Sequence, residues 1–122
     1  MEDVKTLFFN RLHLKRKNVN IIKGWFEKTL RPPLRKIIGR IAILRIDVDW
    51  YRSTKICIES FYDKVIPGGY IVIDDYGHFP GCRRAIDEFL QKNKITVKIN
   101  EIDYTGVYFI KPLKSIKLHF LA

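Results

Sequence analysis

Two short, almost continuous apolar runs are the clearest pattern along the chain. The first is Ile41–Ile46 and the second covers residues 70–73, so each has the length of a single strand. Strands buried on one face alternate apolar and polar residues, whereas near-continuous runs are typical of parallel strands covered on both faces. The pattern therefore predicts two buried parallel strands.

Apolar residues recur at helical spacing between the two runs and again after the second one. The first predicted helix begins at a cap residue, Ser53 or Thr54, and ends before Pro67-Gly68-Gly69. Its apolar face consists of Ile58, Phe61, Tyr62 and Val65. The second predicted helix has an apolar face of Cys82, Ala85, Ile86, Phe89 and Leu90.

The C-terminal part of the chain predicts an antiparallel hairpin. Ile95, Val97 and Ile99 alternate with polar residues, and residues 107–110 form another apolar run after a turn that contains Gly106.

The N-terminal part is less regular. Residues 3–14 predict an amphipathic helix and residues 19–22 a short apolar strand that stops at Gly24. Residues 27–30 form at most one turn of helix before Pro32, after which we expect a basic connection. The elements then follow the order β, β-α-β, α, β-β, which indicates an α/β fold with a partly parallel sheet.

A length of 122 residues is that of one domain, so we expect a single domain over residues 1–122, with residues 113–122 as a C-terminal tail. No apolar stretch approaches the roughly 18 residues of a membrane span, and the N-terminus lacks an apolar signal core. The expected location is the cytoplasm, without membrane contact. Cys57 and Cys82 have no spacing typical of zinc or of a disulfide scaffold, and we expect two reduced thiols.

The net charge of +10 is unevenly distributed. Residues 1–45 hold 12 Lys and Arg against 3 Asp and Glu, a net +9, whereas the remaining residues have a net +1. A basic segment of this kind can follow a phosphate backbone or an anionic surface. Neither a zinc-finger spacing nor an aromatic RNA-binding signature accompanies the charge, so a solvated face is favoured over nucleic acid.

Acidic residues follow both apolar runs. Asp47 and Asp49 come after the first, and Asp74 and Asp75 come directly after the second. In sheets of this class, ligands bind beyond the carboxyl ends of the parallel strands. If the two strands are neighbours, several carboxylates meet at one edge and need a compensating charge, such as a hard divalent cation. Strand-terminal Asp residues also cap helices or face solvent, but several at two strand ends favour a metal site.

Three segments carry a resemblance to a known family: residues 44–54 (LRIDVDWYRST), 67–76 (PGGYIVIDDY) and 79–85 (FPGCRRA). Residues 19–30 extend it upstream. In these segments the chain resembles the macrocin and mycinamicin O-methyltransferases. The resemblance covers roughly residues 3–111, and the two acidic pairs at this separation are more specific than a lone glycine motif.

The resemblance implies methylation of a hydroxyl group on a small, sugar-containing substrate, with S-adenosylmethionine and magnesium. It assigns Asp47, Asp74 and Asp75 as metal ligands and Asp49 as the general base. Trp25 and Phe26 fall where the family's loop approaches the adenine end of the cofactor. The alternative interpretation is a non-catalytic basic module, derived from the same fold, that binds an acidic partner or nucleic acid through the N-terminal third.

The resemblance also implies the C-terminal portion of a Rossmann-like class I methyltransferase sheet. The family's glycine-rich cofactor loop lies before the strand that matches residues 19–22, and no glycine precedes Gly24 here. We therefore expect a partial domain that lacks the cofactor-loop strands and does not bind S-adenosylmethionine alone. An open sheet edge would favour a homodimer or pairing with a chain that supplies the missing half. Val48 and Trp50 depart from the family's usual Gly and Leu, and Lys28 and Arg31 interrupt its usual acidic loop.

Overall fold

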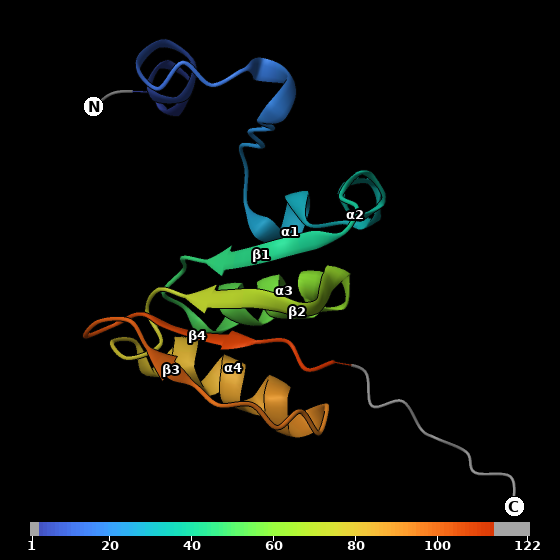
Figure 1. The fold of residues 1–122 in the computed structure, drawn as a ribbon, viewed down its shortest axis with the longest axis vertical. Coiled ribbons are helices and arrows are strands. Elements are labelled where there is room, and N and C mark those ends of the chain that lie inside the picture. The colour runs from blue at the N-terminus through green and yellow to red at the C-terminus, as the bar shows by residue number, and fades with distance from the viewer. Residues whose placement is uncertain (1–2, 114–122) are drawn as a thin grey trace, which may run out of the picture.

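A four-stranded mixed sheet forms the centre of the protein (Figure 1). The computed structural model describes residues 3–113. The strands are β1 (Ile41–Ile46), β2 (Val65–Ile73), β3 (Asn100–Glu101) and β4 (Val107–Ile110), in the spatial order β1-β2-β4-β3. β1 and β2 are parallel, and β4 is antiparallel to both β2 and β3. The predicted α/β fold, with a partly parallel sheet and a C-terminal hairpin, is confirmed.

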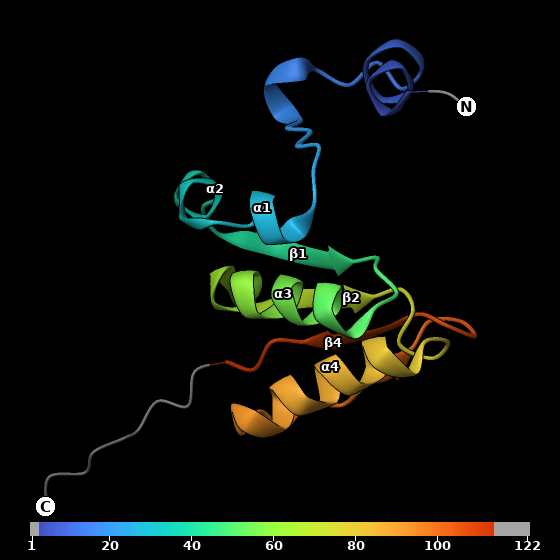
Figure 2. The ribbon, with the colours of Figure 1, turned by 180° about the vertical axis from the view of Figure 1, so that it is seen from behind.

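Two amphipathic helices cover one face of this sheet. They are α3 (Tyr51–Phe61), which continues into a 3-10 turn over Tyr62–Lys64, and α4 (Pro80–Lys92). Both lie behind the sheet in Figure 1 and in front of it in Figure 2. Pro80 suits the first turn of α4, because its fixed φ is compatible with a helix. Proline lacks a backbone N–H, and an N–H at this position would have no acceptor within the helix.

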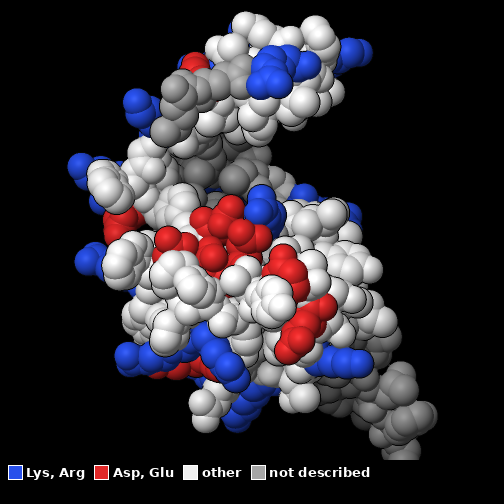
Figure 3. Space-filling model, turned by 90° about the vertical axis from the view of Figure 1, so that its left-hand side faces the viewer, with Lys and Arg blue, Asp and Glu red and all other residues white. Residues whose placement is uncertain are grey.

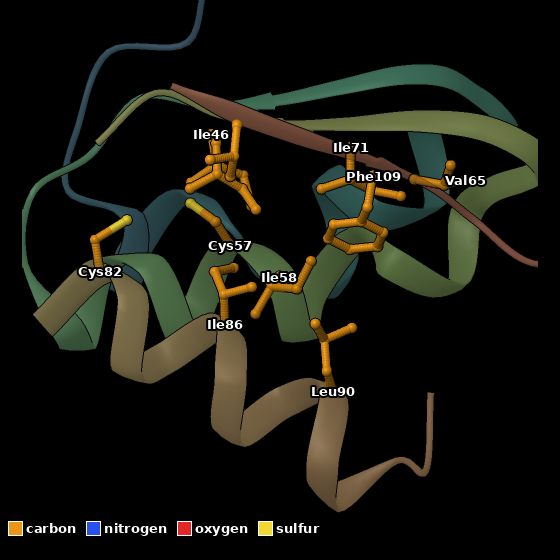
Figure 4. Close-up of a cluster of buried hydrophobic side chains, with 11 residues drawn as sticks. Ile46, Cys57, Ile58, Val65, Ile71, Cys82, Ile86, Leu90 and Phe109 are labelled. Atoms are coloured by element: carbon orange, nitrogen blue, oxygen red, sulfur yellow. The ribbon is translucent and has the colours of Figure 1, made fainter. Parts of the chain in front are cut away.

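The core lies between the sheet and these two helices (Figure 4). Ile71 of β2 and Phe109 of β4 point toward Ile58 of α3 and Ile86 of α4, and all four side chains are fully buried. Ile73 of β2 belongs to the same cluster and is also fully buried. Both cysteines belong to the same cluster and are free thiols, as expected. Burial of this apolar surface is the main contribution that holds the helices on the sheet.

The opposite face of the sheet is largely open, so the expectation that both strands are covered on both faces is wrong. Side chains alternate along β2: Ile71 and Ile73 are buried, whereas Tyr70 is exposed. Ile43, the partner of Tyr70 on β1, has 64% of its surface exposed. Within residues 3–113, the sheet therefore has one packed face and one apolar face in contact with solvent.

β2 begins earlier than the sequence indicates. Val65 was expected on a helix, but it pairs with Ile41 and is buried in the sheet. Gly69 permits this pairing, because a Cβ there would lie only 2.9 Å from the carbonyl oxygen of Ala42. The predicted helix cap is also wrong: α3 starts at Tyr51, and the Thr54 hydroxyl donates a hydrogen bond of 2.8 Å to the Trp50 carbonyl inside the first turn.

The N-terminal part consists of short helical segments with no buried residue. They are a π-helix (Thr6–Arg11), a 3-10 turn (Arg16–Asn18), α1 (Phe26–Thr29) and α2 (Pro32–Ile37). The helix predicted over residues 3–14 is shorter than expected. The strand predicted over residues 19–22 is wrong, because no described strand lies beside it to accept its hydrogen bonds. The basic connection after Pro32 is a helix, since proline is well suited to a first helical turn.

The hairpin is confirmed, although β3 is limited to two residues and residues 95–99 form no strand. Of the predicted tail, Leu113 is exposed, and residues 114–122 lie outside the described residues. No helix within residues 3–113 combines the length and apolar character that a membrane crossing requires.

The packed face makes a direct prediction about stability. Ile86→Ala removes a fully buried side chain between α4 and the sheet, and we expect it to lower the free energy of unfolding by about 2–5 kcal/mol. Ile43→Ala on the open face is the matched control and should change it by less than about 0.5 kcal/mol. Urea titration followed by circular dichroism measures both, and equal losses would contradict a one-sided core.

Candidate functional site

The carboxyl ends of β1 and β2 bring the predicted acidic residues together. Ile46 and Ile73 are paired in register, and the backbone N–H of Asp74 donates a hydrogen bond of 3.0 Å to the Ile46 carbonyl. Asp47 and Asp74 therefore leave the sheet side by side. Acidic side chains gather in the middle of the face that looks onto these strand ends (Figure 3).

Three of the four carboxylates converge on one point. Asp47, Asp74 and Asp75 each offer a carboxylate oxygen, and these oxygens lie within 4.8 Å of one another. Their side chains remain accessible at the sheet edge: Asp47 is exposed, and Asp74 and Asp75 are half-buried. The residues that the family resemblance assigned as metal ligands are thus close enough to share one cation.

The convergence has an electrostatic consequence. Partial desolvation raises the pKa of the Asp47 carboxyl, and the neighbouring Asp74 carboxyl adds to this effect. Desolvation likewise raises the pKa of Asp75, reinforced by a hydrogen bond between its carboxyl group and that of Asp49. In both groups burial is the larger cause, and the neighbouring carboxyl groups act in the same direction.

Arg45 partly compensates this charge, a contact that the sequence analysis missed. Its guanidinium lies 3.1 Å from a carboxylate oxygen of Asp74 and 3.3 Å from one of Asp47. Residues two apart on a strand share a face, so the spacing of Arg45 and Asp47 was a usable signal. The pairing with Asp74 depends on the register between the strands.

Asp49, together with Asp47 of the cluster, lines a cleft of about 320 Å³. Trp25 and Phe26, the residues predicted for the cofactor, line the same cleft from α1 and the residue before it. Trp50 and Glu27 also line it and were not predicted for the site. Trp25 and Trp50 are 76% and 75% exposed, so two indole rings are available to a ligand beside the acids.

The geometry defines a class of protein: a mixed α/β domain with a carboxylate cluster and an aromatic cleft at the ends of its parallel strands. A family model described as Macrocin-O-methyltransferase (TylF) matches residues 1–111. The chain belongs to this family, and the predicted resemblance is confirmed.

Individual relatives agree with the family match. The chain is 39% identical over 108 residues to demethyldecarbamoylnovobiocin O-methyltransferase of Streptomyces niveus, a match that covers 88% of this chain and 40% of the relative. It is 37% identical to 8-demethyl-8-(2,3-dimethoxy-alpha-L-rhamnosyl)-tetracenomycin-C 4'-O-methyltransferase of Streptomyces olivaceus, covering 83% of this chain and 37% of the relative.

The solved structure of the O-methyltransferase NovP superimposes with a TM-score of 0.80 at 36% identity, covering 87% of this chain and 43% of NovP. The fold therefore corresponds to the C-terminal portion of a NovP-like methyltransferase. The chain spans about 40% of the length of the curated relatives it matches.

Removing Arg45 tests the compensation within the cluster. In buffer without divalent cations, Arg45→Met should lower the free energy of unfolding by up to about 1 kcal/mol, because the three neighbouring carboxylates lose the positive charge of the guanidinium. The loss should shrink in 1 M NaCl, which screens exposed charges. Thermal denaturation measures it, with Lys98→Met as the control for loss of one exposed positive charge. A loss no larger than that of the control would contradict the pairing.

Proposed function

We propose that this chain provides the metal- and acceptor-binding part of an S-adenosylmethionine- and Mg²⁺-dependent O-methyltransferase that acts on a hydroxyl group of a sugar-bearing metabolite. The convergence of Asp47, Asp74 and Asp75 within 4.8 Å beside an aromatic cleft is the observation that carries the proposal. Membership of the macrocin O-methyltransferase family supports it.

The donor set fits magnesium. All three groups are carboxylate oxygens, which are the hard ligands that Mg²⁺ uses, and this ion is commonly held by few carboxylates together with water or substrate oxygens. Burial, with the neighbouring carboxyl groups adding to it, raises the pKa of Asp47 and of Asp75, and a bound cation would favour their ionised forms. When bound, the ion would lower the pKa of a coordinated acceptor hydroxyl and orient it.

The aromatic cleft fits the adenine end of S-adenosylmethionine, the cofactor that supplies an electrophilic methyl group on its sulfonium. Trp25 and Phe26 would contact the adenine, as the family resemblance implies. The exposed indole of Trp25 offers a flat apolar surface, and aromatic pairs of this kind favour stacked or edge-on contacts.

Asp49 is the group that we assign as general base. It lines the aromatic cleft beside Asp47 and interacts with Asp75, so it is close to two of the proposed metal ligands. A carboxylate in this position accepts the proton of the acceptor hydroxyl as the methyl group is transferred. The protein otherwise contributes orientation, by holding the acceptor in place beside the cofactor.

Metal binding is the first test of the proposal. Mg²⁺ should raise the melting temperature, since a ligand that binds the folded state stabilises it by about 2.7 kcal/mol at one hundred times its Kd. Asp47→Asn or Asp75→Asn should abolish the rise. Differential scanning fluorimetry with and without Mg²⁺ measures the effect.

Glu59→Gln is the matched control, because it removes an exposed carboxylate on α3 outside the cluster and should leave the Mg²⁺ effect intact. The metal assignment fails if millimolar Mg²⁺ leaves the wild-type melting temperature unchanged, or if Glu59→Gln and Asp75→Asn behave alike.

The role of Asp49 makes a separate prediction. Asp49→Asn should retain the Mg²⁺ stabilisation but lower methyl transfer about 10²- to 10⁴-fold, the usual contribution of a positioned general base. Because the chain alone is not expected to bind S-adenosylmethionine, transfer of a labelled methyl group to a rhamnoside acceptor is measured after mixing the chain with a second chain that supplies the missing N-terminal part of the domain. A variant that loses the Mg²⁺ effect as well would place Asp49 among the metal ligands instead.

A further inference from the structure

Arg45 is a strand residue whose side chain reaches past the end of its strand. It is the next-to-last residue of β1, two positions after the exposed Ile43 and two before Asp47. Side chains two apart on a strand lie on the same face, so Arg45 leaves the sheet on its open face. Its guanidinium extends from there to the carboxyl ends of both parallel strands.

A single guanidinium nitrogen contacts one carboxylate from each strand end. Nη2 of Arg45 donates a hydrogen bond of 3.1 Å to Oδ1 of Asp74 and lies 3.3 Å from Oδ2 of Asp47. Asp47 and Asp74 are also two of the three residues that converge as proposed metal ligands. The guanidinium and a metal ion would therefore draw on the same two carboxyl groups.

The charge of one guanidinium does not balance this cluster. Arg45 faces three carboxyl groups, each with an oxygen within 4.8 Å of the others, and Asp49 interacts with the third of them, Asp75. Like charges at such a separation repel one another, and more strongly where fewer water molecules surround them. A divalent cation carries twice the charge of Arg45, so it compensates the same carboxylates more fully.

The exposure of the ion pairs allows Arg45 to leave the cluster. Its side chain is 59% exposed, and those of Asp47 and Asp74 are 52% and 39% exposed. Ion pairs between exposed groups contribute little to stability, because water solvates both partners and pairing costs side-chain entropy. Arg45 can therefore turn into solvent without disturbing the core, which lies on the other face of the sheet.

We propose that Arg45 is a built-in competitor of the metal ion at the acid cluster. While the site is empty, its guanidinium holds Asp47 and Asp74 together, and a divalent cation that binds there displaces it. The assignment rests on the proposed function for the presence of a metal site. Arg45 thereby weakens metal binding and couples it to the movement of one side chain. A residue that only stabilises the cluster would instead strengthen metal binding.

Magnesium affinity of Arg45 variants tests the competition. Isothermal titration of the full chain with MgCl₂ at low ionic strength should show that Arg45→Met binds Mg²⁺ about 10-fold more tightly than the wild type, because no positive charge has to be displaced. Arg45→Gln should behave like Arg45→Met. Arg45→Lys keeps the charge and should stay within about 3-fold of the wild type.

Ionic strength gives a second measurement of the same effect. The difference in Mg²⁺ affinity between Arg45→Met and the wild type should shrink in 1 M NaCl, because salt screens the exposed guanidinium. A difference that does not depend on salt would overturn the competition by charge.

Arg35→Met is the matched control. Arg35 forms an ion pair of 2.8 Å with Asp63, which precedes β2, whereas the acid cluster follows β1 and β2 at their other ends. Its loss should leave the Mg²⁺ affinity within about 2-fold of the wild type, since exposed charges more than a Debye length apart are largely screened. The proposal fails if Arg45→Met binds Mg²⁺ no more tightly than the wild type, or if Arg35→Met tightens binding equally.

The same titrations separate this proposal from the proposed function. If Asp75→Asn abolishes Mg²⁺ binding while Arg45→Met leaves it unchanged or weakens it, the metal site stands and the competition is overturned. If neither the wild type nor Arg45→Met binds Mg²⁺, the metal-dependent function fails and the competition fails with it. Binding that is detectable only in Arg45→Met supports the competition most directly.

Discussion

The parallel pairing of β1 with β2 is the constraint on which the rest of the site depends. Register between Ile46 and Ile73 makes both strands end at the same level, and the hydrogen bond from the Asp74 N–H to the Ile46 carbonyl carries the pairing one residue further. A shift of one residue would turn the side chains of one strand to the opposite face. The acidic residues that follow each strand would then no longer converge.

This arrangement concentrates negative charge, and the fold tolerates it for two reasons. The core beneath the sheet supplies stability from apolar burial that does not depend on the charges. The cluster also lies at the accessible sheet edge, where water screens it and where Arg45 neutralises part of it. An accessible, incompletely neutralised carboxylate cluster is a suitable place for a cation to bind and for a substrate hydroxyl to reach it.

Two clefts of different size open near the carboxyl ends of β1 and β2, and their walls are built differently. Trp25, Phe26 and Trp50 line the smaller one; both indole rings are exposed, whereas Phe26 is half-buried against the core. The larger one, of about 930 Å³, opens between the loop after β2 and the turn from β3 to β4, and hydrogen bonds to Asp103 and Asp87 hold its walls. The smaller cleft thus offers exposed indole rings beside Asp47 and Asp49, whereas hydrogen bonds hold the walls of the larger one.

Local sequence by itself determined the elements whose residues form complete periodic patterns: the apolar runs of β1 and the end of β2, the apolar face of α4, and the acidic pairs that follow the strands. Other features required the tertiary structure. Residues 19–22 are apolar enough for a strand but have no described neighbour to pair with, and Val65 joins β2 because Gly69 lets Ala42 approach. The open sheet face, the ion pair of Arg45 with Asp74 and the larger cleft depend on contacts between segments far apart in the chain. Periodicity describes one segment at a time, whereas register and packing between segments decide which side chains meet.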